Sequence, residues 1–104
     1  MELKDAEDAI EFLRKTGVDV QPLAKQARLK THMLKYVEAL TIKSMANQGI
    51  SVSLQKDYAR ADDKWLEAAE EDAEAFSEWT ALQERRDTAR TTISLYQTMV
   101  KDRL

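Results

Sequence analysis

The stretch that decides the fold is residues 53–104, SLQKDYARADDKWLEAAEEDAEAFSEWTALQERRDTARTTISLYQTMVKDRL. Positions taken alternately four and three residues apart form one seam, and twelve of its fifteen members are apolar or aromatic. The seam consists of Leu54, Tyr58, Ala61, Trp65, Ala68, Asp72, Ala75, Trp79, Leu82, Arg86, Ala89, Ile93, Tyr96, Val100 and Arg103. This period keeps one face of a helix against a partner along its length. Because no Gly or Pro interrupts the stretch, it predicts one continuous helix over residues 53–104.

Two further helices are predicted before this stretch. Apolar residues at three-to-four spacing predict a short helix over residues 3–15, which Gly17 ends in a left-handed C-cap conformation. Residues 17–21 are then a linker, and Pro22 opens a second helix over residues 22–48. Gly49 ends that helix, and either Ser51 or Ser53 caps the next one. The predicted fold is all-α and a single domain, with the last two helices forming an antiparallel hairpin in a coiled-coil-like bundle.

The predicted helix 22–48 has a wide apolar face. One strip contains Leu23, Ala27, Leu34, Val37 and Met45, and an adjacent strip contains Leu29, Met33, Tyr36 and Leu40. This width exceeds one coiled-coil seam and indicates contact with two neighbours. The longer last helix extends past the hairpin from about residue 81 onward. Its apolar residues there require cover, either from helix 3–15 or from another chain.

Charge and composition narrow the class of protein. The chain has 104 residues, no cysteine and a net charge of −3. Residues 22–49 carry five basic and one acidic residue, residues 53–84 carry three basic and ten acidic, and residues 85–104 carry five basic and two acidic. Adjacent basic and acidic helices are typical of an internally complementary hairpin. No run is long and apolar enough to span a membrane, and the residues after Met1 do not resemble a secretory signal, so we expect a cytoplasmic protein with no membrane association.

Asp72 and Arg86 are polar interruptions of the seam, and each lies seven residues from Trp79. Two copies packed antiparallel about a two-fold axis at Trp79 would place Asp72 of one copy opposite Arg86 of the other. This hypothesis predicts a homodimer with the interface Trp65, Asp72, Trp79, Leu82, Arg86, Ile93 and Tyr96. In the alternative, the helix bends and both polar residues point to solvent or pair four residues along the helix.

The sequence contains no strong catalytic, metal-binding or cofactor-binding motif. The single histidine, His32, is expected on a helix surface, and the many carboxylates are expected to form a solvated acidic face, so we predict no metal, cofactor or catalytic residue. The sequence favours a non-catalytic interaction protein, an adaptor or inhibitor that binds an unidentified protein through a helical surface that includes this acidic face. The alternative is a nucleic-acid-associated accessory protein that uses Arg85, Arg86 and Arg90.

Overall fold

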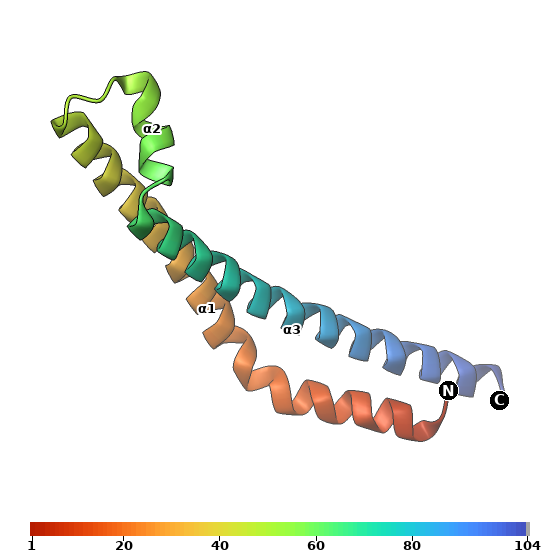
Figure 1. The fold of residues 1–104 in the computed structure, drawn as a ribbon. Coiled ribbons are helices and arrows are strands. Elements are labelled where there is room, and N and C mark those ends of the chain that lie inside the picture. The colour runs from red at the N-terminus through yellow and green to blue at the C-terminus, as the bar shows by residue number, and fades with distance from the viewer. Residues whose placement is uncertain (104) are drawn as a thin grey trace. The chain divides into compact units, whose positions relative to one another are not determined.

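The computed structural model describes residues 1–103 and contains three helices within them: α1 (Leu3–Asn47), α2 (Val52–Arg60) and α3 (Asp63–Asp102) (Figure 1). Residues 1–103 contain no β-strand. The prediction of an all-helical protein is therefore confirmed. Coiled-coil packing between chains stays a prediction, and the end of the predicted last helix at Leu104 lies outside the described residues.

Helix α1 is continuous, so the prediction of two helices at 3–15 and 22–48 with a linker at 17–21 is wrong. Gly17 and Pro22 both lie inside α1, where they lower the stability of a helix by about 1 and 3 kcal/mol relative to Ala. The covered positions explain why the helix nevertheless continues. Leu13, Thr16 and Val20 are half-buried and keep the alternating three-and-four spacing across Gly17. A face packed along the whole segment opposes the weak helix propensity of these two residues.

The predicted helix 53–104 is also wrong as a single element, because it stops at Arg60 and restarts at Asp63. Asp62 explains the restart. Its Oδ1 accepts a hydrogen bond from the backbone N–H of Lys64 at 2.9 Å, and its carbonyl accepts from Leu66 N at 3.0 Å. This is the bonding of an N-cap residue, which satisfies a free N–H at the start of α3. Leu54 and Tyr58, which the seam assigns to a covered face, are exposed in α2.

Helix α1 ends with the capping interactions that the sequence predicted around Gly49. Gly49 has a φ of +81°, which is strained for a residue with a side chain. Gly49 N donates to Ala46 O at 3.1 Å, and Ile50 N donates to Met45 O at 3.1 Å. These two bonds form a Schellman motif with Gly49 at C′, which confirms the predicted stop. Ser51 occupies the N-cap position of α2 without a side-chain capping bond.

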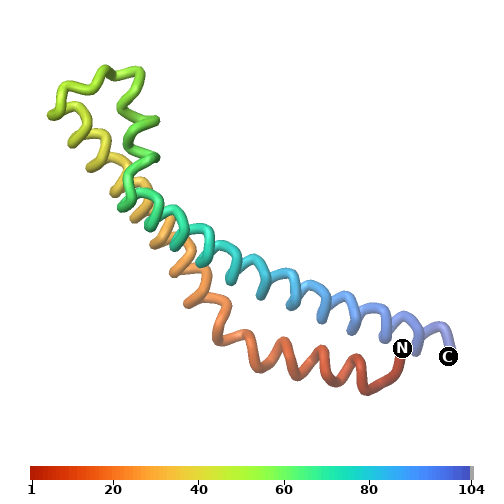
Figure 2. The backbone as a smooth tube through the Cα atoms, viewed as in Figure 1, coloured from red at the N-terminus to blue at the C-terminus, as the bar shows by residue number. Residues whose placement is uncertain are grey.

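The chain divides into two compact units. Unit 1 contains Met1–Leu23 and the residues from Glu78 onward, and unit 2 contains Ala24–Ser77. Within each unit α1 and α3 run antiparallel, as the tube in Figure 2 shows. The buried apolar residues among those described are small: Ala6, Ala9, Ala27, Ala59, Ala75 and Ala89, with Leu82 as the largest.

The seam of α3 is covered by the protein's own chain. From Trp65 to Tyr96, every seam position in α3 is buried or half-buried. Alanines at several of these positions let the two helix backbones approach closely. The seam therefore identified the covered face of α3 correctly, and α1 provides its cover within each unit.

Candidate interaction surfaces

Asp72 lies in unit 2 and is bonded to α1. The Thr31 hydroxyl donates to Asp72 Oδ1 at 2.6 Å. Beside this bond, Lys30 Nζ lies 3.1 Å from Glu71 Oε2, so two consecutive residues of α3 meet two consecutive residues of α1. The carboxylate of Asp72 is half-buried and has a hydrogen-bond donor within its own chain.

Arg86 lies in unit 1 and also points at α1. Its Nη1 donates to the carbonyl oxygen of Leu13 at 2.8 Å and to Thr16 Oγ1 at 2.6 Å. The Thr16 hydroxyl in turn donates to Phe12 O at 2.7 Å. This short network holds the half-buried Arg86 against α1, close to Gly17, where the sequence predicted that the first helix ends.

The hydrogen bonds of Asp72 and Arg86 to α1 test the two interpretations of these polar seam residues. The alternative with both residues in solvent or paired four residues along is wrong, because each is half-buried and bonded to α1. The homodimer centred on Trp79 stays a prediction. Its seven proposed interface residues are all covered to some degree by their own chain, so a second copy at this face would have to displace α1.

The three arginines of the nucleic-acid alternative have three different surroundings in unit 1. Arg86 is turned into the network with Leu13 and Thr16. The guanidinium carbon of Arg85 lies 4.8 Å from the centre of the Phe12 ring, a cation–π contact. Arg90 Nη1 lies 2.9 Å from Asp87 Oδ1 on the same helix. The structure does not bring the three guanidinium groups together as one unpaired basic patch.

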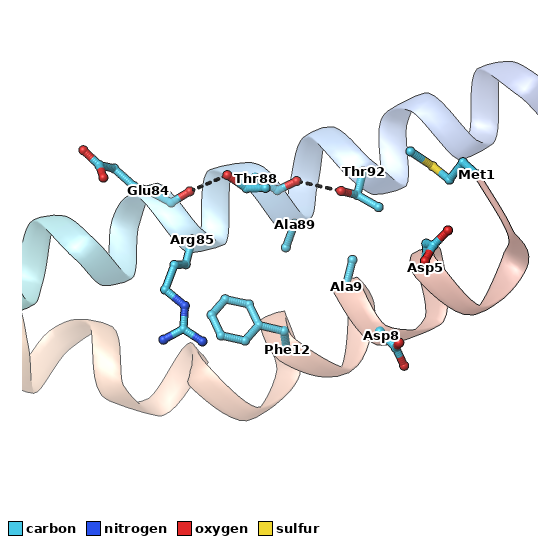
Figure 3. Close-up of a pocket in the computed structure, with 10 residues that line it drawn as sticks. All are labelled: Met1, Asp5, Asp8, Ala9, Phe12, Glu84, Arg85, Thr88, Ala89 and Thr92. Carbon is cyan, nitrogen blue, oxygen red and sulfur yellow. Dashed lines mark hydrogen bonds between the residues drawn. The ribbon is translucent and has the colours of Figure 1, made fainter.

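A hollow of about 700 Å³ lies between α1 and α3 in unit 1 (Figure 3). It is lined by Met1, Asp5, Asp8, Ala9, Phe12, Glu84, Arg85, Thr88, Ala89 and Thr92. The hydroxyls of Thr88 and Thr92 both donate to backbone carbonyls of α3 at 3.0 Å, and Asp8 points away from α3 in Figure 3. The lining contains no nucleophile paired with a base, so the hollow offers no evident chemistry.

Unit 2 has an exposed apolar stripe on each of its two long helices. The α1 stripe is Leu29, Met33, Tyr36 and Leu40, whose exposed fractions run from 44% to 66%. Sequence reasoning predicted that these four residues contact a second neighbour, and within residues 1–103 nothing buries them. The α3 stripe is Leu66, Ala69, Ala73 and Phe76, in which Leu66 and Phe76 are 49% and 57% exposed and Ala69 is half-buried. Sequence reasoning missed the α3 stripe, although its three-four-three spacing was visible beside the seam.

Opposite charges accompany the two stripes. The α1 part of unit 2 carries Lys25, Arg28, Lys30, Lys35 and Lys43 with one acid. The α3 part carries six acids and one lysine. Four of these acids, Asp63, Glu67, Glu70 and Glu74, are exposed at four-three-four spacing and form an acidic strip on one side of α3. Unit 2 therefore presents a basic apolar surface and an acidic apolar surface.

The remaining candidate site residues and the comparisons with known proteins do not identify a function. His32 is exposed on α1, as predicted. Among residues 1–103, no three His, Asp or Glu side chains are grouped closely enough to hold a metal ion, and no helix there is both long and apolar enough to cross a bilayer. Comparison with protein-family models, curated proteins and solved structures found no match, so the functional argument rests on the residues themselves.

Proposed function

We propose that this protein is a non-catalytic adaptor or inhibitor that binds another protein in the cytoplasm through the helical surface of unit 2. The observation that carries the proposal is the distribution of apolar side chains. The buried apolar residues described are six alanines and Leu82, whereas fifteen large apolar side chains are exposed. Contiguous exposed apolar patches mark interaction sites in soluble proteins.

The acidic strip supplies the second part of the proposal. Asp63, Glu67, Glu70 and Glu74 present four carboxylates along one side of α3. Such a row attracts a basic partner and sets its orientation, because complementary potentials act mainly on encounter rate and specificity. A partner that combines apolar contact with basic residues matches this surface. An inhibitor of a protein that binds anionic ligands is the clearest instance of this chemistry.

The nucleic-acid alternative has weaker support. Binding by phosphate neutralisation requires several unpaired cations on one surface. Arg86 is committed to Leu13 and Thr16, and Arg90 is paired with Asp87. Arg85 is the member of the set that keeps its charge available, stacked on Phe12.

The proposal is tested by capture of partners from the native host. The immobilised chain is compared with a variant carrying Glu67→Lys, Glu70→Lys and Glu74→Lys. The matched control carries Glu7→Lys, Asp19→Lys and Asp57→Lys, which reverses three exposed acids off the strip. We expect a partner that the first variant loses and the control retains. Identical capture by both variants would overturn the role of the acidic strip.

A further inference from the structure

The two exposed stripes of unit 2 match in length. The α1 stripe covers eleven residue steps and the α3 stripe covers ten, which is about 15–17 Å of helix in each case. Their spacings are four-three-four on the α1 stripe and three-four-three on the α3 stripe, so on an antiparallel partner the paired positions stay within one residue of register. Stripes of nearly equal length and the same average period can pack side by side over most of their extent.

The side chains of the stripes are complementary in size when aligned antiparallel. The four pairs are Leu29 with Phe76, Met33 with Ala73, Tyr36 with Ala69, and Leu40 with Leu66. In the two central pairs a large side chain faces an alanine. Alternation of large and small residues lets facing helices interdigitate without voids.

The charges flanking the stripes favour the same pairing. The α1 part of unit 2 has five basic residues and one acidic, and the α3 part has one basic and six acidic. Opposite charge on the two surfaces promotes this contact, while two α1 stripes or two α3 stripes would bring like charges together.

The stripes cannot meet within one copy. Met33 of the α1 stripe lines a hollow of about 220 Å³ together with Glu67 and Glu71 of α3. Helical periodicity places Leu66 and Phe76 on the other flank of α3, beyond Ala68 and Asp72. The two stripes therefore lie on opposite flanks of the unit.

We infer that the α1 stripe of one copy packs antiparallel against the α3 stripe of a second copy. This pairing rests on the proposed role of unit 2 as an interaction surface, and it names a second copy as the partner of the two stripes. Because the two surfaces differ, the contact is head-to-tail, and repetition produces a ring or an open chain of copies.

Complementation between two variants tests the inference. Met33→Asp disables the α1 stripe and leaves the α3 stripe intact, and Phe76→Asp does the reverse. Light scattering of the full chain, from micromolar to millimolar concentration, should show concentration-dependent association of the wild type. Each variant alone should associate roughly 10- to 100-fold more weakly, as expected for loss of one buried large side chain. An equimolar mixture of the two should form a heterodimer that grows no further, because one intact surface of each kind remains.

Several results would refute the pairing. These are a wild type that stays monomeric at every concentration, variants that assemble like the wild type, and a mixture that stays monomeric. Leu95→Asp is the matched control, since Leu95 is 52% exposed and belongs to neither stripe. If circular dichroism shows a variant unfolded, Leu40→Asp with Leu66→Asp replaces the pair. A refuted pairing leaves capture by the acidic strip as a separate measurement of the proposed function.

Discussion

Replacement of Arg86 by alanine tests the packing of α1 against α3 in unit 1. The guanidinium donates to Leu13 O at 2.8 Å and to Thr16 Oγ1 at 2.6 Å. A hydrogen bond to a charged group contributes about 1.5–3 kcal/mol to stability. Because Arg86 is half-buried, water replaces part of these bonds, and we expect Arg86→Ala to lower the free energy of unfolding by about 2 kcal/mol. This is a large share of the roughly 5–15 kcal/mol typical of a small domain.

Urea unfolding followed by circular dichroism measures this change. A loss of about 2 kcal/mol moves the midpoint by roughly 1 M, given typical urea slopes. The control is Arg90→Ala, which removes an exposed pair with Asp87 and should change stability by less than about 1 kcal/mol. Thr16→Val combined with Arg86→Ala completes a double-mutant cycle, in which we expect a coupling energy of about 0.5–3 kcal/mol. Equal effects of Arg86→Ala and Arg90→Ala, or zero coupling, would refute the network as a source of stability.

Four further predictions concern helix continuity and assembly. Gly17→Ala should raise the free energy of unfolding by about 0.5–1 kcal/mol and the melting temperature by several degrees, because Gly17 is helical and a Cβ there meets nothing within 4 Å. A lower melting temperature would instead indicate that Gly17 adopts the left-handed C-cap conformation before a linker. Asp62→Ala should destabilise the chain by about 0.5–2 kcal/mol in thermal unfolding through loss of the α3 N-cap, and an unchanged transition would contradict that cap. Asp72→Arg should not be rescued by Arg86→Asp in light scattering or unfolding, since the two residues have separate partners on α1; rescue would support the dimer centred on Trp79. Wild-type protein should produce no mobility shift of single- or double-stranded DNA even at low salt, and a salt-sensitive shift would revive the alternative.

The covered face of α3 could be read from the residues alone. The seam from Trp65 to Tyr96 is a periodic property of one helix, and any partner that packs on that helix uses the same face. Gly49 as a helix stop was equally local, because its positive φ and the two bonds of its Schellman motif involve residues within a few positions. Periodicity and capping involve residues within one or two helical turns, so they can be predicted from the sequence without knowledge of the fold.

The continuity of α1 through Gly17 and the break before α3 at Asp62 could not be predicted in this way. Gly17 has the propensity of a stop signal, and only the packing of Leu13, Thr16 and Val20 against another helix makes α1 continue through it. Asp62 lies in an uninterrupted apolar period, yet its side chain caps α3 and the chain breaks there.

The tertiary structure also decided which helix covers the seam. The sequence left Asp72 and Arg86 either facing each other across a two-fold axis between two copies, or in solvent or paired four residues along their own helix, and neither interpretation placed them against α1. Thr31 and Thr16 settle their placement, and both are ordinary helix residues whose importance depends on a neighbour more than forty positions away. Residue periodicity specifies that a face must be covered, whereas the identity of the cover depends on long-range pairing and on the helix ends that permit it.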